Sequence, residues 1–594
     1  MQVSSLENVT KLLVSTALGH EKADLVLKGA NLVDVYTGEL LEGTDVAIKG
    51  DRIALIGKAD HTISSDTTVL DSRGKYLAPG VLDGHVHIDD SMLTVTEFAR
   101  AVLPHGTTGV FMDPHEIANV LGLRGVKLMM DEAKNVPLRV FTCVPSCVPA
   151  TFPEFETAGA EIGPREVEEA LKWDGVVGLA EMMNYPGVLL GDDKVHGEIQ
   201  ATLKAGKIVE GHADSLLGAE LAAYAAAGIS SCHESIRKID GLERARLGIY
   251  TMIREGFASI RNVAGVIKIV TENRIDPRRV ILVTDDRHPG DLVTEGHMDY
   301  VVKRAIEEGV DPVTTIQMAT LNTAEHYGVD RDIGGIAPGK LADILVLDAL
   351  SKVSIKTVIV GGIPVAKDGK LIVGLKPPSY PEYARKTVKV KQPLTAKDFV
   401  VRAPFERGHL NAHVIGVTGE VTTKHLVEKL SVEKGEIQPS IEKDIMKIAV
   451  IERHKLTGNT GLGFVKGFGF KEGATASTIA HDSHNLLVIG LDNQDMAIAT
   501  NKLVETGGGI VAVNKGEILG LVKLPIAGLM SDKSLEEVYE EVKKMEDIWI
   551  RLGCKIPMPF PTLILLALPV LPELRITDKG LIDTIRFKKI DLVD

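Results

Sequence analysis

The sequence predicts an α/β fold centred on a metal-dependent (β/α)8 TIM barrel, with a composite β-sandwich domain and an additional C-terminal α/β domain. Two observations lead to this prediction. In residues 79–334, apolar runs of strand length alternate with amphipathic stretches, and eight such pairs in about 250 residues match the usual size of a (β/α)8 barrel. Shorter β-rich pieces lie on both sides of that segment.

The β-rich pieces are the first element of this fold. ADLVLKGANLVDV, GTDVAIKGDRIALIG and TTVLDSRGKYLAPG have the pattern of strands joined by Gly and Asp turns, and GKLADILVLD and TVIVGGIPVAKDGKLIV repeat it later. We therefore expect residues 24–78 and 335–375 to pair as one β domain. The apolar spacing within residues 1–23 suits a short amphipathic helix.

The middle segment supplies the eight barrel strands. They are VLDGHVHI, TTGVFMD, LRVFTCV, VVGLAEM, KIVEGHA, GISSCHE, GFASIRN and RVILVTDD. A doubly wound sheet is the alternative, but it needs fewer strands. After a proline-rich linker, PPSYPEYARKTVKVKQP, residues 376–594 mix strands and helices and are expected to form the C-terminal α/β domain.

Composition and charge exclude several classes of protein. Lys and Arg number 67 against 81 Asp and Glu, and the resulting net charge of -14 argues against a dedicated nucleic-acid or anionic-membrane binder. Four cysteines are too few for a disulfide framework and fit a reducing compartment. The N-terminal segment lacks the pattern of a signal peptide, and the longest apolar stretch, PTLILLALPVLPEL, is too short to span a bilayer. We expect a soluble, cytoplasmic protein.

Six side chains that can bind metal lie at the ends of five of the predicted strands. They are His85, His87, Glu181, His212, His233 and Asp285. The strand ends of a barrel open on one face, and the i, i+2 spacing of the first two histidines directs both imidazoles to one point. Each residue alone has a structural alternative, such as a helix cap or a core ion pair, but six donors at strand ends predict a site for Zn, Mn or Fe(II).

These motifs resemble the amidohydrolase superfamily. PGVLDGHVHI after a β-rich piece, and IAPGKLADILVLD after the barrel, carry this resemblance over roughly residues 24–375. Further motifs resemble the bacterial and archaeal adenine deaminases over nearly the whole chain. They are DPHEIANV, SCVPA, GLAEMMNYPGV, GHAD, CHES, TDDRHP and the C-terminal TASTIAHDSHNLLVIG.

The resemblance implies a binuclear centre with two divalent cations, Mn2+ as the first choice and Fe2+ or Zn2+ as alternatives. His85 and His87 then hold one cation, His212 and His233 the other, and Glu181 bridges them where many relatives have a carbamylated lysine. The implied reaction is hydrolysis of adenine to hypoxanthine and ammonia, a purine salvage step, by a metal-activated hydroxide. The resemblance also suggests a homo-oligomer, a dimer or higher.

The reaction needs groups that move protons. Asp285 is our first choice as the proton shuttle, and His115, Glu116 and Glu234 are candidates for a contact to N1 of the ring or for the second proton. The DPHE motif could instead be a turn and helix cap, and Glu234 could orient His233.

The HDSH cluster of the C-terminal region leaves three alternatives open. His481 and His484 could contact the substrate as part of a lid, serve the structure alone, or form a third metal site.

The same sequence features disfavour two other functions. A cyclic-amide hydrolase of the dihydroorotase or hydantoinase kind is disfavoured by Glu181 in place of a lysine and by the long C-terminal region. A non-catalytic scaffold that keeps the barrel is disfavoured because all six candidate ligands are present.

Overall fold

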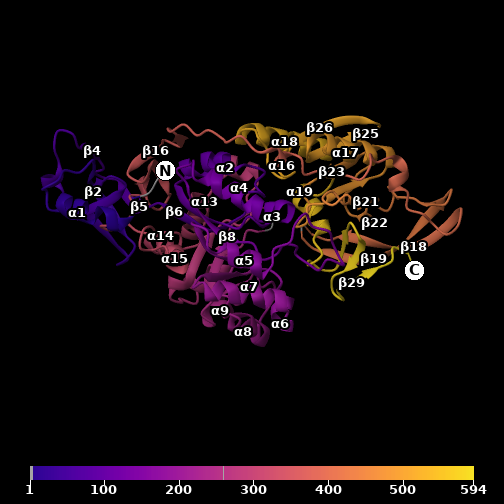
Figure 1. Cartoon of the computed structure of the whole chain (residues 1–594), viewed down its shortest axis with the longest axis horizontal. Helices are drawn as coiled ribbons and strands as arrows, with labels where there is room; N and C mark the ends of the chain where they lie inside the picture. The colour runs from indigo at the N-terminus through magenta and orange to yellow at the C-terminus, as the bar shows by residue number, and fades with distance from the viewer. Residues whose placement is uncertain (1–3, 258–259, 420, 594) are drawn as a thin grey trace.

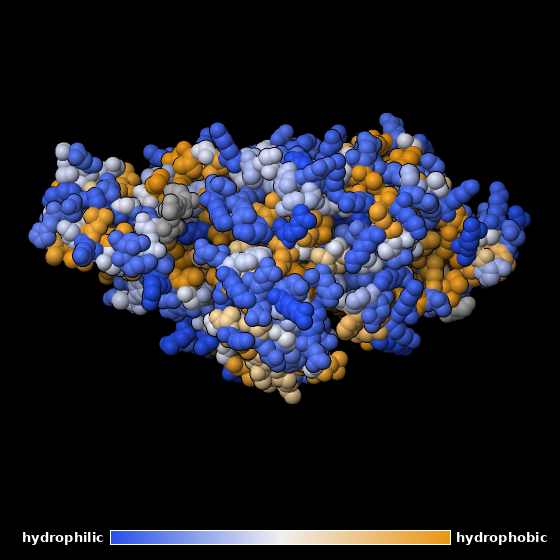
Figure 2. Space-filling model, viewed as in Figure 1, coloured by the Kyte–Doolittle hydropathy of each residue, from blue (hydrophilic) through white to orange (hydrophobic). Residues whose placement is uncertain are grey.

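The computed structural model describes residues 4–257, 260–419 and 421–593. The molecule is elongated, with the N-terminal β-rich part at one end, the parallel strands and their helices in the middle, and the C-terminal region at the other end (Figure 1). Every helix of the described residues is too short or too polar to cross a membrane. Hydrophilic side chains predominate on the face drawn in Figure 2, and apolar ones are scattered in small groups.

The two β-rich pieces share one sheet of nine strands, against which the N-terminal helix α1 (Leu6–Ala17) packs. The sheet is joined where β5 pairs with β1 on one side and with β14 on the other, so that Leu77 lies opposite Val346. Its strands are β1 (Leu25–Asp34), β2 (Glu39–Lys49), β3 (Arg52–Gly57), β4 (Thr68–Asp71), β5 (Tyr76–Pro79), β14 (Ile344–Ala349), β15 (Ser354–Val360), β16 (Ile363–Lys367) and β17 (Lys370–Leu371).

The middle segment forms two parallel sheets. One contains β6 (Val81–Val86), β7 (Thr107–Met112), β8 (Arg139–Val144), β9 (Val176–Met182) and β10 (Ile208–Gly211), and the other contains β11 (Ser231–Cys232), β12 (Tyr250–Arg254) and β13 (Val280–Val283). The sheets curl toward each other at both edges. The backbone N–H of Asp285 donates to the carbonyl of His85 at 3.0 Å, and that of Ser230 donates to Val209 at 2.9 Å.

Helices cover the outside of these strands. The strands are buried on both faces, and their sequences are therefore continuous apolar runs. Asp192, for example, caps α7 by accepting from two backbone N–H groups, and α7 then buries Val195 and Ile199. The helices are α2 (Val95–Val102), α3 (His115–Leu121), α4 (Leu123–Ala133), α5 (Pro164–Ala170), α6 (Tyr185–Leu190), α7 (Asp193–Lys204), α8 (Gly218–Ala226), α9 (Lys238–Arg246), α10 (Val263–Val266), α11 (Lys268–Thr271), α12 (Pro289–Thr294), α13 (Met298–Glu307), α14 (Pro312–Met318) and α15 (Leu321–His326).

One predicted strand is wrong. The seventh strand is β12, with the sequence YTMIR, and not GFASIRN at residues 256–262. Residues 258 and 259 of that stretch lie outside the described residues, and the rest of it is a loop. Gly248, with φ of 79°, ends the turn after α9, so the chain enters the sheet at Tyr250, six residues earlier than the apolar pattern suggested.

The C-terminal region has a second sheet of nine strands, mostly antiparallel, and a small sheet of three. The large sheet contains β18 (Arg407–Val417), β19 (Thr423–Glu433), β20 (Glu436–Ile437), β21 (Ile445–Ile451), β22 (Thr460–Lys466), β23 (Ala474–Ser477), β24 (Leu486–Gly490), β25 (Gly509–Asn514) and β26 (Glu517–Lys523), and the small one β27 (Leu574–Thr577), β28 (Gly580–Asp583) and β29 (Lys588–Ile590). The helices are α16 (Glu382–Arg385), α17 (Asn493–Thr506), α18 (Leu535–Arg551) and α19 (Pro559–Ile564). The loop between β23 and β24, residues 478–485, carries the HDSH cluster and reaches the ends of the parallel strands.

Candidate metal centre

Two buried imidazoles at the end of β6 turn their free nitrogens toward each other. His85 Nδ1 lies 2.8 Å from a carboxylate oxygen of Glu210, and His87 Nδ1 lies 3.0 Å from the backbone carbonyl of Asp113. Both partners only accept hydrogen bonds, so each Nδ1 carries a proton and each Nε2 is the nitrogen left to bind a cation. The two Nε2 atoms are 3.1 Å apart. Burial lowers the pKa of His87, but its hydrogen bond to Asp285 outweighs burial and raises that pKa well above its usual value, so a proton and a metal ion compete for this position.

Glu181, at the end of β9, lies between two groups of imidazoles. Its Oε2 is 3.0 Å from His233 Nε2 and also contacts His212 Nδ1. Its Oε1 is 3.6 Å from His87 Nε2 on the other side. Burial raises the pKa of Glu181, but the charges and hydrogen bonds of His212 and His233 outweigh it and hold the pKa well below its usual value. One ionised carboxylate therefore faces both groups.

Asp285 follows β13 and completes the cluster. Its Oδ1 lies 3.2 Å from His87 Nε2 and 3.8 Å from His85 Nε2. Its Oδ2 lies 2.6 Å from Nη1 of Arg254, which is also 2.6 Å from Glu234 Oε1. Burial raises the pKa of Asp285, but Arg254 and His87 outweigh it and hold that pKa well below its usual value.

The structure thus brings together all six side chains that the sequence predicts as metal ligands. The nitrogen and oxygen atoms of His85, His233 and Asp285 lie close enough to hold one ion, and so do those of Glu181, His212 and His233. Nitrogen and oxygen donors of this kind suit divalent transition metals. Their roles as ligands remain predictions.

The other candidates for catalysis lie around this cluster. His115 Nδ1 is 3.5 Å from Glu181 Oε1, so its ring borders the centre. Glu234 Oε1 is 3.4 Å from His212 Nε2. Glu116 contacts His481 and His484 of the C-terminal region through its two carboxylate oxygens, and its Oε1 also lies 3.2 Å from His115 Nε2.

Glu116, His481 and His484 lie close enough together to hold an ion, but the tautomer of His484 argues against a metal site there. Its Nδ1 accepts a hydrogen bond from the backbone N–H of Ala480 at 3.2 Å. The proton of the neutral ring is therefore on Nε2, which donates it to Glu116. A nitrogen that carries a proton offers no lone pair to a cation. The geometry thus favours an anchor between the two parts of the chain over a third metal site.

Three residues of the site were missed by the sequence analysis. Glu210 orients His85, Asp83 accepts from the backbone N–H of Thr284 at 3.0 Å, and Arg254 joins Asp285 to Glu234. Glu210 and Asp83 each stand two residues before a predicted histidine ligand, so the alternation of a strand could have placed them on the same face. Arg254 was hidden because its strand was predicted in the wrong place.

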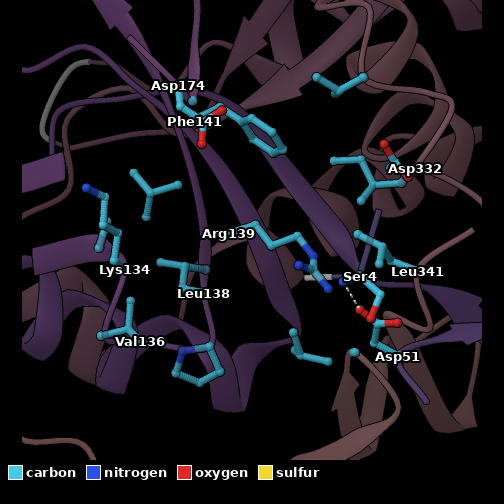
Figure 3. A pocket seen from close by; sticks show the side chains of 18 of the residues that line it. Ser4, Asp51, Lys134, Val136, Leu138, Arg139, Phe141, Asp174, Asp332 and Leu341 are labelled. Carbon is cyan, nitrogen blue, oxygen red and sulfur yellow. Dashed lines mark hydrogen bonds between the residues drawn. The ribbon is translucent and has the colours of Figure 1, made fainter. Parts of the chain in front are cut away.

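A cavity of about 1150 Å³ lies elsewhere and does not belong to this cluster (Figure 3). It is lined by Arg139, which begins β8, and by Asp174, which precedes β9, whereas the cluster lies where the parallel strands end. Ser4 donates its backbone N–H to Asp51 at one side of this cavity.

Comparisons with known proteins relate the chain to characterised families. The model of the amidohydrolase family matches residues 76–369, and that of the adenine deaminase C-terminal domain matches residues 420–588. The chain is 52% identical to an adenine deaminase of Moorella thermoacetica over 590 residues, which are 99% of this chain and 98% of the relative. It is 49% identical to one of Clostridium botulinum and 47% identical to one of Mesorhizobium japonicum, each over 98% or more of this chain and 96% or more of the relative. Among solved structures, molinate hydrolase is similar with a TM-score of 0.45 and 18% identity, over 59% of this chain and 95% of that chain.

Proposed function

This chain belongs to the adenine deaminase family of amidohydrolases, and from that membership we propose that it hydrolyses adenine to hypoxanthine and ammonia in purine salvage. The family that the sequence motifs resemble is thereby confirmed. The observation that carries the activity is the position of Glu181, whose two oxygens face two groups of imidazoles at the ends of separate strands. Such a carboxylate suits a bridge between two cations.

The residues present fit two divalent cations, with Mn2+ as the first choice and Fe2+ or Zn2+ as alternatives. His85 and His87 are the ligands of one, His212 and His233 those of the other, with Glu181 between them and Asp285 beside the first. When bound, the cations would lower the pKa of a water molecule to near neutral pH.

The protein's own residues then position the substrate and move protons. Asp285 directs Oδ1 at the centre while Arg254 holds Oδ2, so it is placed to take a proton from water and pass it to the leaving amine. His115 borders Glu181 and is our candidate for the contact to N1 of the ring. Glu234 touches His212 and Arg254, which suits either proton transfer or orientation of His212. Glu116 contacts His481 and His484 as well as His115, which favours an anchoring role for it.

We also propose the following arrangement of domains. Strands β6 to β13 close into one (β/α)8 barrel, residues 79–334, because hydrogen bonds join the two curled sheets at both edges. Residues 24–78 and 335–375 form the composite β domain, residues 1–23 its N-terminal helical segment, and residues 376–594 the C-terminal α/β domain. The cytoplasmic location and the homo-oligomeric state stay predictions from the sequence.

The test is release of ammonia and hypoxanthine from adenine, with manganese supplied and with chelator. We expect Glu181→Gln to lose at least about 100-fold in turnover, because a neutral amide cannot replace a bridging carboxylate. Glu198→Gln is the matched control. Glu198 is 1% exposed, lies outside the cluster, and burial raises its pKa to about 8, so an amide resembles its neutral form. Full turnover by Glu181→Gln would remove the bridging role, and no turnover of adenine by the unmodified protein would refute the function.

A further inference from the structure

A second cavity, of about 420 Å³, lies between the middle segment and the C-terminal region. Arg124 of α4 lines it from one side, and the linker of residues 377–393 lines it from the other with Lys386, Thr387 and Lys389. His454, which follows β21, also borders it. None of the six predicted metal ligands is among its lining residues, so this cavity is separate from the metal cluster.

The lining of this cavity is positively charged, although the whole chain has a net charge of -14. Glu382 is the one carboxylate among the lining residues, and Lys386 forms an ion pair with it. Arg124 stacks on Tyr383, with its guanidinium carbon 4.0 Å from the centre of the ring. No ion pair joins Arg124 or Lys389 to a carboxylate within the part of the chain that the structure describes. Two cations of the cavity therefore lack a counterion.

A third positive charge lies directly behind Thr387. Arg453 is 0% exposed, and its Nη1 donates to Thr387 Oγ1 at 3.2 Å. Its other nitrogens donate to the backbone carbonyls of His484 and Ala527, so all three acceptors are neutral. Burial lowers the pKa of Arg453 to about 9, and the charge of Glu452 offsets only part of that decrease. Arg453 is still charged at neutral pH, and a buried charge without a paired counterion costs free energy.

Thr387 connects this buried charge to the cavity. Its side chain lines the cavity, and the residue is 8% exposed. Because Oγ1 already accepts from Arg453, the hydroxyl proton points away from the guanidinium, and no acceptor among the described residues takes it. A hydroxyl held in this way can donate a hydrogen bond to a ligand inside the cavity.

We propose that this cavity binds the phosphoryl group of a small anionic ligand. Phosphate oxygens are charged acceptors, and they match the guanidinium of Arg124, the ammonium of Lys389 and the hydroxyl of Thr387. The bound negative charge also compensates Arg453, which lies just behind the hydroxyl. A cavity of this size suits a sugar phosphate as well as a phosphate ion. Because its walls come from two parts of the chain, the ligand holds the linker against α4.

The test is calorimetric titration of the metal-loaded protein with two probes, inorganic phosphate and ribose 5-phosphate, at constant ionic strength. We expect saturable binding of at least one probe and a higher midpoint of thermal unfolding in its presence. The probe that binds more tightly identifies the ligand as free phosphate or as a phosphate ester. Neither measurement requires turnover of adenine, so the result is independent of the function proposed above.

Variants of the lining locate the bound anion. Arg124→Gln and Lys389→Gln should each weaken binding by about 10-fold or more, because each removes a charged donor. Thr387→Val should weaken it by about 10-fold, whereas Thr387→Ser keeps the hydroxyl and should bind as the wild type does. Lys127→Gln is the matched control. It removes a positive charge from the same helix as Arg124, but Lys127 pairs with Asp131 at 2.8 Å and does not line the cavity.

Two results overturn the proposal. One is the absence of saturable binding of either probe to the wild type. The other is equally tight binding in the wild type, Arg124→Gln and Lys389→Gln, because the anion then binds elsewhere, for example at the metal centre. If Thr387→Val does not fold, the variants of Arg124 and Lys389 decide, since both side chains are exposed.

Discussion

Glu210 is the residue whose replacement tests the metal centre most directly, although it binds no cation itself. Its Oε2 accepts the proton of His85 Nδ1 at 2.8 Å, and its Oε1 accepts from Tyr327 Oη at 2.7 Å and from Cys143 Sγ at 2.9 Å. The residue is 1% exposed, so water contributes almost nothing to its hydrogen bonding. Because Glu210 fixes the tautomer of His85, it also fixes which nitrogen faces a metal.

The size of the effect follows from what each substitution leaves behind. In Glu210→Gln the side-chain carbonyl can still accept from His85, but the bond is no longer charge-assisted, which costs about 1 kcal/mol or about fivefold in metal affinity. In Glu210→Ala the proton of His85 Nδ1 has no acceptor, which costs about 1–3 kcal/mol and corresponds to about 5- to 150-fold. The order of affinities should therefore be wild type, then Gln, then Ala.

The assay is competition for Mn2+ with a chelator of known affinity, followed by metal analysis of the recovered protein. Glu198→Gln again serves as the control for a buried carboxyl outside the site. Thermal unfolding of the metal-free proteins separates lost affinity from lost stability. If both Glu210 variants bind Mn2+ as tightly as the wild type, His85 does not depend on its acceptor and the assignment of its tautomer is wrong.

Two further predictions concern the same part of the protein. Arg254→Met should lower turnover by about 100-fold, because Asp285 loses the contact that holds its Oδ2 and a small misplacement of a reacting group costs that much. Arg254→Lys should recover part of the lost turnover. An equal loss in both variants would contradict the positioning role of Arg254. The ring of His288 is buried and stacks on Phe257, and burial lowers its pKa to about 4. The unfolded chain therefore binds the proton more tightly than the folded protein does. Stability that is present above about pH 6.5 is lost as the pH falls toward 4. Urea unfolding at pH 7 and at pH 4.5 measures this loss. In His288→Phe the decrease in unfolding free energy between the two pH values should be smaller by up to about 3 kcal/mol, and an unchanged decrease would contradict the role of His288.

The clustering of the six candidate ligands could be predicted from the sequence because their signal is local. An apolar run followed by His or Glu marks the end of a buried strand, and parallel strands place their ends at one edge. The same rule failed for Arg254, because YTMIR is short and the apolar stretch after it is a loop. Glu210 was overlooked for a different reason. The role of an acidic residue inside an apolar strand can be assigned only when its partner is known, and His85 is 125 residues away in the chain.

The contact between the HDSH loop and Glu116 was beyond any local pattern. It joins residues 368 positions apart in the chain, and its geometry depends on how two separate sheets meet. The sequence could therefore offer the histidines as candidates without choosing among a lid, a structural role and a metal site. The choice required the hydrogen bond from Ala480, which fixes one tautomer.

Charge balance explains why these imidazoles and carboxylates are found together at all. At least five buried carboxylates surround the centre, those of Asp113, Glu181, Glu210, Glu234 and Asp285, whereas Arg254 is the one permanent cation in contact with them among the residues described. Buried charge must be compensated. Protons on the imidazoles are one source of compensation: burial lowers the pKa of His212, but Glu234 and Glu181 outweigh it and raise that pKa to about 10. A divalent cation bound to the same nitrogens supplies the compensating charge in place of protons. Metal and protons therefore compete for one set of nitrogens, and metal affinity must fall as the pH falls.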